Sequence, residues 1–190
     1  MKALIVDFDD SFTFNILSEL TELQLEVDVI HFQKFSSINL NSYKLVVLGP
    51  GPGHVDDYLS FLDHVSELIN YSQNKEFKLL GICLGHQLIH QVLNRDIRKL
   101  MNPIHGQTVE IKFATHHILL SELENKTFEV QLYNSWGVFG VGNQNLFDME
   151  IMGESGEILA SFSKFLTTYQ FHPESIGTSC PELFFKQSLV

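Results

Sequence analysis

Alternation between short apolar runs and stretches of helical periodicity restricts the fold of the first hundred residues more than any other feature. The runs are rich in branched side chains, as is typical of buried strands, and occupy residues 3–6, 27–31, 45–48 and 79–82. Helical spacing of apolar residues follows a Ser11 cap, precedes the fourth run and continues after Cys83. Strands separated by helices predict a mostly parallel sheet that is covered on both faces. We therefore expect an α/β fold.

The pattern changes beyond about residue 100, where turns rich in Asn, Gly and Ser separate short strand-like runs. These runs occupy residues 109–113, 128–133, the surroundings of Ile151, 158–162 and 168–171. Antiparallel pairing is expected there, followed by a closing helix over Pro181–Leu189. No Pro/Gly/Ser-rich linker divides the chain. We expect one domain over residues 1–190, with a central, mostly parallel sheet flanked by helices and a smaller antiparallel sheet in the second half.

Composition narrows the possible partners. The chain has 23 acidic and 12 basic residues and a formal charge of −11, which argues against binding nucleic acid or an anionic membrane surface. It has no signal-peptide pattern and no apolar run of the ~18 residues that a membrane helix needs. A cytoplasmic location is expected. Two widely separated cysteines, Cys83 and Cys180, do not predict a disulfide framework in that setting.

Cys83 lies in the segment Gly81-Ile82-Cys83-Leu84-Gly85, which has the G-x-nucleophile-x-G spacing of a sharp strand-to-helix turn. Such a turn places the sulfur at the start of a helix, whose partial positive charge favours the thiolate. The backbone N–H of Leu84 is then a candidate oxyanion donor. The alternative is that Cys83 is a small buried apolar residue.

Thiolate chemistry at Cys83 needs a proton carrier, and His172 followed by Pro173 and Glu174 fits that role. In extended backbone, residues two apart point to the same face, so Glu174 could orient the imidazole of His172. Pro173 favours extended backbone before it. The alternative is an exposed turn that holds an incidental histidine and glutamate.

The loop Gly49–Gly53 follows the third predicted strand and contains three glycines, which permit close approach of backbone to a ligand. It lacks the GK[ST] ending of a phosphate-binding loop. The N–H of Gly51 or Gly53 could complete an oxyanion hole, although a rigid turn explains the loop equally well. Taken together, the three segments offer a nucleophile, a base and an oxyanion donor.

Five short motifs in order give the chain a resemblance that runs from end to end. They are Asp10-Ser11-Phe12-Thr13, Pro50-Gly51-Pro52-Gly53, Gly81-Ile82-Cys83-Leu84-Gly85-His86-Gln87, His105-Gly106 and Phe171-His172-Pro173-Glu174-Ser175. The chain resembles class I glutamine amidotransferases, in particular the glutaminase subunits of anthranilate synthase and aminodeoxychorismate synthase. It departs from their usual pattern at Gly49 and over Tyr133–Trp136, where Asn134 replaces a histidine and Trp136 a leucine.

The resemblance implies a flavodoxin-like fold and hydrolysis of L-glutamine to glutamate and ammonia. The ammonia would pass to a chorismate-using synthase subunit that makes anthranilate, 4-amino-4-deoxychorismate or both. It implies a Cys83, His172 and Glu174 triad without cofactor or metal, and an oxyanion hole from Gly51 and Leu84. The implied glutamine contacts are Gly51, Pro52, Gly53, Gln87, Ser135 and Trp136.

Other interpretations remain open. Asp7-Phe8-Asp9-Asp10-Ser11 is close to the D-x-D-x-[TS] opening of haloacid-dehalogenase-type phosphatases, in which the first aspartate is the nucleophile and Mg²⁺ is bound, although polar termination of a buried strand explains it too. His86 and His90 share one helical face and could bind a metal, and His116-His117 is a further pair; hydrogen-bonded or solvated histidines are the simpler explanation. A non-catalytic homologue that retains the fold is the remaining alternative.

Overall fold

The computed structural model describes residues 1–74, 77–113, 120, 122–140 and 146–189. The strands are β1 (Lys2–Asp7), β2 (Glu26–His31), β3 (Leu45–Leu48), β4 (Lys78–Ile82), β5 (Asp96–Lys99), β6 (Gln107–Lys112), β7 (Thr127–Leu132), β8 (Trp136–Phe139), β9 (Met149–Met152), β10 (Ile158–Phe162) and β11 (Leu166–Tyr169). The α-helices are α1 (Thr13–Glu22), α2 (Leu62–Asn74), α3 (Leu84–Val92) and α4 (Pro181–Gln187). Short 3₁₀ segments are η1 (Phe32–Ser37), η2 (Leu40–Ser42) and η3 (Val55–Phe61).

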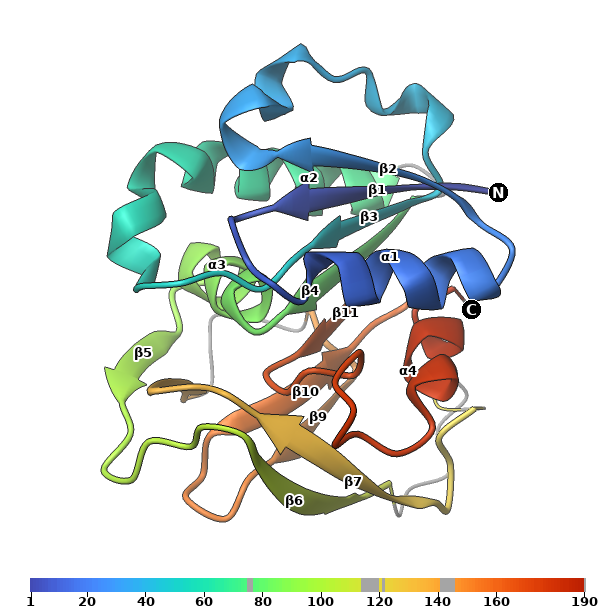
Figure 1. Cartoon of the computed structure of the whole chain (residues 1–190). Helices are drawn as coiled ribbons and strands as arrows, with labels where there is room; N and C mark the ends of the chain where they lie inside the picture. Colours follow the sequence, from blue (N-terminus) through green and yellow to red (C-terminus); the bar gives the residue numbers. More distant parts are fainter. Residues whose placement is uncertain (75–76, 114–119, 121, 141–145, 190) are drawn as a thin grey trace.

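A seven-stranded sheet with the order β2-β1-β3-β4-β11-β10-β9 runs through the centre of the molecule (Figure 1). The strands from β2 to β11 in this order pair in parallel, and β10 pairs antiparallel with both β11 and β9. The prediction of an α/β fold with a mostly parallel sheet is confirmed. Because the strands from β2 to β11 are parallel, their carboxyl ends meet at one edge of the sheet, which is where ligands bind in such folds.

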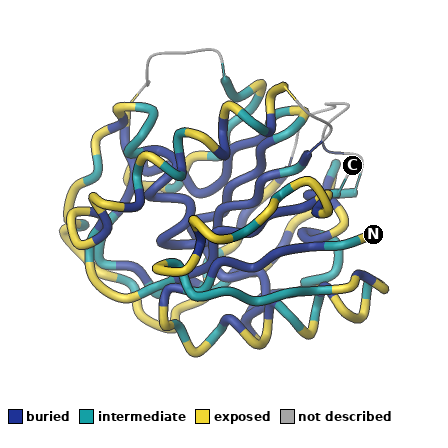
Figure 2. Tube along the Cα trace, turned by 90° about the horizontal axis from the view of Figure 1, so that it is seen from above, coloured by how far each residue is buried: buried dark blue, intermediate teal, exposed yellow. Residues whose placement is uncertain are grey.

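The apolar side chains of β1 alternate between two cores. Ala3 and Ile5 pack with Ile16 and Leu20 of α1, whereas Leu4 and Val6 pack in the cluster that contains α2 and α3. The phenylalanines of α4 complete the first core. The strands form the buried centre of the fold and the exposed residues lie around it (Figure 2). This alternation follows from the period of two along a strand, and it explains why the sheet has helices on both faces.

The antiparallel part of the second half divides into two kinds of structure. β9 and β10 extend the main sheet, while β6 pairs with β7 and β5 with β8 in separate two-stranded ribbons. β5 and β8 were not expected from the sequence. The final strand, expected over residues 168–171, ends instead at Tyr169 and pairs in parallel with β4 on one side. The chain leaves the sheet there, and His172 then pairs with Gln131 of β7.

The start of α1 also differs from the expectation. Phe12, rather than Ser11, is the N-cap residue, and it makes no side-chain capping hydrogen bond. The carboxylate of Asp10 accepts from the Phe12 N–H at 2.8 Å. Asp7 ends β1 and accepts from the Asp9 N–H and the Thr13 hydroxyl. The carboxylates of Asp7 and Asp10 therefore accept local hydrogen bonds, as expected if this segment is the polar end of a buried strand.

His86 and His90 belong to a buried hydrogen-bonded group beneath α3. His86 Nδ1 lies 2.9 Å from the Thr168 hydroxyl, His90 Nε2 lies 3.3 Å from the same hydroxyl, and the two rings are 4.4 Å apart. Ser161 connects His90 to Glu150, which pairs with Arg95 at 2.9 Å. The two histidines are hydrogen-bonded, as the simpler explanation had it, and this group ties α3 to β11 and β10. His116 and His117 lie outside the described residues.

Burial lowers the pKa of His86 to about 3, and it lowers the pKa of His90 well below its usual value. Arg95 acts on both histidines in the same direction, and His86 adds to the effect on His90. Both side chains are therefore neutral at pH 7.

No helix of the described residues is long and apolar enough to cross a membrane.

The free energy of unfolding should fall on mild acidification, because the unfolded chain takes up protons at His86 and His90 below pH 6.5 while the folded chain does not. Each of the two histidines should remove about 1 kcal/mol between pH 6.5 and 5.5, and the raised pKa of His172 should offset a smaller part of this loss. Urea unfolding at the two pH values measures the change. His105→Asn, at an exposed position, should show the same change, and a constant free energy would contradict the prediction.

Candidate active site

Cys83 stands at the junction of β4 and α3 in a strained backbone conformation, with φ 50° and ψ −99°. Its N–H donates to the Tyr169 carbonyl at 2.8 Å, which anchors the junction to β11. A Cβ at Gly85 would overlap the carbonyl group of Leu48, so only glycine lets α3 begin this close to β3. The sharp turn expected from the spacing of Gly81, Cys83 and Gly85 is therefore present, and it places the sulfur at the helix N-terminus.

Gly51 lies against the first residue of α3. A Cβ at this position would overlap the side chain of Leu84 and lie 2.7 Å from Cβ of Phe8. The loop can approach Leu84 only because residue 51 has no side chain. Gly51 is thus packed against the side chain of Leu84, and both residues line the cavity with Cys83. The Leu84 N–H, as the first of the helix, has no acceptor within it.

His172 and Glu174 form a buried pair, with His172 Nδ1 and Glu174 Oε1 2.8 Å apart. Their side chains are 3% and 0% exposed. The backbone of His172 is held on both sides, because its N–H donates to the Gln131 carbonyl at 2.9 Å and its carbonyl accepts from the Thr178 hydroxyl at 2.7 Å. The segment is therefore buried rather than exposed, but it is a turn at Pro173 and Glu174, where the Ser175 N–H donates to the His172 carbonyl at 3.1 Å. The extended backbone expected there is wrong.

Two aromatic rings flank the His172 imidazole. The ring centroids of Phe12 and Tyr133 lie 4.8 and 5.1 Å from it. Phe12 precedes α1 and Tyr133 follows β7, so segments from distant parts of the sequence enclose the ring. These contacts restrict rotation of the imidazole and leave Nε2, which has no hydrogen-bond partner among the described residues, as its available nitrogen.

Burial by itself lowers the pKa of His172, but interactions with Cys83 and Glu174 outweigh it and raise the pKa well above the usual value. The imidazolium is therefore the favoured form at neutral pH. A raised folded-state pKa adds stability that is fully present below pH 6.5, and this stability is lost as the pH rises through the folded-state value.

Cys83 opens into a cavity of about 200 Å³. Its lining consists of Gly51, Pro52, Gly53, Cys83, Leu84, Gln87, His105, Tyr133, Asn134, Ser135 and Trp136. Every residue expected to bind glutamine or form the oxyanion hole is in this set. His172 and Glu174 are buried and are not part of the lining, and His172 interacts with Cys83. The structure thus brings all the sequence-predicted site residues together.

Gln170 belongs to the site but was not assigned a role from the sequence. Its side-chain amide donates to the Cys83 sulfur at 3.8 Å, and its carbonyl oxygen accepts from Gln87 at 3.1 Å. Gln87 also donates to the Trp136 carbonyl at 3.0 Å. Gln170 follows the end of β11 and lies two residues before His172, and no motif of its own marks it in the sequence.

Two further histidines lie at the cavity: His105 belongs to its lining, and His54 packs against the lining residue Trp136. The His54 ring centroid lies 4.1 Å from that of Trp136, and His105 Nε2 lies 3.2 Å from the Ser135 hydroxyl. Asn134 donates to the Trp136 carbonyl at 3.0 Å. His54 has no sequence signal of its own. The unusual residues Asn134 and Trp136 are therefore accommodated in the cavity wall by local contacts.

The pKa of His172 should fall when either group that raises it is removed. NMR titration of ¹³C-labelled histidine should show a lower midpoint for His172 in Glu174→Gln and in Cys83→Ala than in the wild type, because each variant deletes one charge that favours the imidazolium. The resonance of His86, whose pKa is lowered by burial, should behave alike in all three proteins. An unchanged midpoint in both variants would show that these contacts do not control the ring.

Comparison with known proteins identifies the family of the chain. A family model described as glutamine amidotransferase class-I matches residues 4–190. Anthranilate synthase component 2 of Saccharolobus solfataricus is 33% identical over 93% of this chain and 91% of its own length, and that of Leptospira biflexa is 32% identical over 94% of both. A Thermotoga maritima glutamine amidotransferase crystal structure shares the fold, with a TM-score of 0.74 at 20% identity over 92% of this chain and 76% of its own. The chain belongs to the class-I glutamine amidotransferase family.

Proposed function

We propose that this chain hydrolyses L-glutamine to glutamate and ammonia with Cys83 as nucleophile, His172 as proton carrier and Glu174 as the group that orients His172. One observation carries the proposal. A strained cysteine at a helix N-terminus opens into a cavity and raises the pKa of a buried histidine, whose Nδ1 is 2.8 Å from a carboxylate oxygen. This arrangement is the one required for acyl transfer through a thioester.

In the first half of the reaction the Cys83 thiolate attacks the side-chain amide carbonyl of glutamine. A carbon–sulfur bond forms and the carbonyl electrons move to oxygen, where the N–H groups of Leu84 and Gly51 would stabilise the negative charge. His172 then gives its proton to the amide nitrogen. The carbon–nitrogen bond breaks, ammonia leaves and a thioester remains.

In the second half water attacks the thioester carbon as His172 removes its proton. A second oxyanion forms in the same hole and collapses, the carbon–sulfur bond breaks, and glutamate leaves with the Cys83 thiolate and the protonated His172 restored. Glu174 keeps the Nδ1 side of the ring occupied, so Nε2 carries the proton in both halves. Gln170, which donates to the sulfur, stabilises the thiolate.

The acceptor of the ammonia is proposed to lie in another subunit. The relatives are named as component 2 of anthranilate synthase, a name that implies a further component. By resemblance that subunit binds chorismate and uses the ammonia to make anthranilate, 4-amino-4-deoxychorismate or both, and the relatives' names favour anthranilate. No observation of the structure favours the phosphatase alternative, because Asp7 and Asp10 accept local hydrogen bonds.

Replacing the nucleophile tests the function directly. Cys83→Ser should abolish glutamate and ammonia release, because a serine hydroxyl does not form its anion near neutral pH, whereas the fold should persist because the side chains are of similar size. Coupled glutamate assays should be run on the chain alone and with its cognate chorismate-binding subunit. Cys180→Ser, at an exposed thiol, is the matched control and should retain full activity. Wild-type turnover in Cys83→Ser, or no turnover by the wild type under either condition, would overturn the proposal; the second result would favour a non-catalytic homologue.

The base and its orienting group should differ in importance. His172→Ala should lower kcat by about 10²- to 10⁴-fold, because no other described group is placed to carry the proton. Glu174→Gln should cost less, since the amide retains an acceptor for Nδ1 while losing its charge. Steady-state kinetics at saturating glutamine measures both effects. An equal or greater loss in Glu174→Gln would show that the carboxylate does more than orient the ring.

A further inference from the structure

A second cavity, of about 310 Å³, lies on the other side of β8 from the candidate active site. Trp136 of β8 lines the active-site cavity, whereas Phe139 of the same strand lines the second one. The backbone of Gly137 packs against Glu157, because a Cβ at this position would lie 3.3 Å from the Cβ of Glu157. β8 is thus a wall between the two cavities. We call the second one the Glu157 cavity.

Glu157 gives this cavity a buried carboxylate. The residue is only 7% exposed, and its Oε2 atom is buried without a hydrogen-bond partner among the described residues. A carboxylate oxygen removed from water without a donor destabilises the protein, and such groups usually have a partner in the functional state. The geometry therefore points to a donor that the described residues do not supply.

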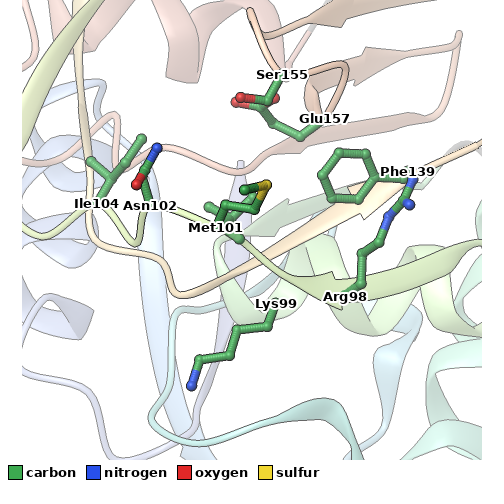
Figure 3. Close-up of a pocket in the computed structure, with 9 residues that line it drawn as sticks. Arg98, Lys99, Met101, Asn102, Ile104, Phe139, Ser155 and Glu157 are labelled. Carbon is green, nitrogen blue, oxygen red and sulfur yellow. The ribbon is translucent and has the colours of Figure 1, made fainter.

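The remaining walls favour a cation as that donor. Figure 3 shows Glu157 and Ser155 on one side of the cavity, Asn102 on another and the Phe139 ring opposite Asn102, with the Met101 side chain between them. A carboxylate and an amide are groups that bind ammonium and guanidinium ions, whereas the Phe139 ring already has the Arg98 guanidinium beside it.

The two basic residues that line the cavity do not fill this role. Arg98 pairs with Asp96 at 3.2 Å, and its guanidinium lies 4.1 Å from the Phe139 ring centroid. The Lys99 side chain extends away from the other labelled residues (Figure 3).

We propose that the Glu157 cavity receives a lysine or arginine side chain of the synthase partner, an inference that rests on the proposed function. The acidic chain, with a net charge of −11, favours a basic partner surface. Met101, whose side chain is 98% exposed, provides an apolar contact at the cavity. A basic side chain held there would place the partner against β8, next to the cavity where ammonia forms.

A partner bound at the Glu157 cavity would also contact the strand that forms the wall of the active-site cavity. The Trp136 carbonyl of β8 accepts hydrogen bonds from Gln87 and Asn134, and Leu100 donates to the Ser135 carbonyl at 2.9 Å. Leu100 lines the Glu157 cavity, while Ser135 and Gln87 line the active-site cavity. An anchored partner would therefore hold the strand that positions these groups.

The test compares two variants that remove one negative charge from the same hairpin. Glu157→Gln should raise the Kd for the cognate chorismate-binding subunit about 10- to 100-fold, because a buried charge-assisted hydrogen bond is lost. Glu154→Gln, at an exposed position two residues after Met152, should change the Kd by about twofold or less. Isothermal titration calorimetry without glutamine measures binding independently of turnover.

Further measurements separate docking from stability and from small-ligand binding. The Tm of free Glu157→Gln should equal or exceed that of the wild type, since Oε2 loses no partner; a lower Tm together with weaker binding would overturn the proposal in favour of a structural role. Equal Kd values for both variants would also overturn it, even if butylguanidinium bound to the wild-type cavity. Glu157-dependent binding in a chain without glutaminase activity would support docking while refuting the proposed function.

Discussion

The backbone of Cys83 adopts a conformation that residues with side chains seldom occupy, and the surrounding packing holds it there. Strands β3, β4 and β11 fix the end of the sheet, and the absence of a side chain at Gly85 lets α3 begin directly against Leu48. Such strain persists only where neighbouring structure over-determines it. The position of the sulfur, the approach of Gly51 to Leu84 and the shape of the cavity all depend on this junction.

A buried set of hydrogen-bonded side chains stabilises that junction. His86 and His90 of α3 share the Thr168 hydroxyl of β11, so the helix that begins at Cys83 is tied to the strand that leads to His172. Hydrogen bonds are directional, whereas apolar packing tolerates small shifts. The distance between the two reacting elements is therefore set by specific bonds as well as by the apolar core.

Much of this arrangement was predictable from the sequence because its signals are local. The strands and helices of the first hundred residues follow from apolar periodicity, and the turn at Cys83 from the spacing of its glycines. β5 was missed because Asp96, Arg98 and Lys99 give it no apolar pattern, and β8 because Gly137 interrupts its short run. Gln170 and Phe12 were missed as site residues because their roles arise from packing between distant segments. Ser11 failed as a cap because Asp10 provides the hydrogen bond instead.

Because β11 lies beside β4 in the sheet, the site can form only after the last strand has been synthesised. Cys83 follows a strand near the middle of the chain, whereas His172 follows the last strand to be synthesised. Early strands can pair before β11 exists, but the space between β4 and β10 is completed only when residues 166–169 insert there. Under the proposed triad, an incomplete or nascent chain holds a cysteine without its base. If that proposal holds, catalytic competence coincides with completion of the sheet, and a partly made chain does not hydrolyse glutamine.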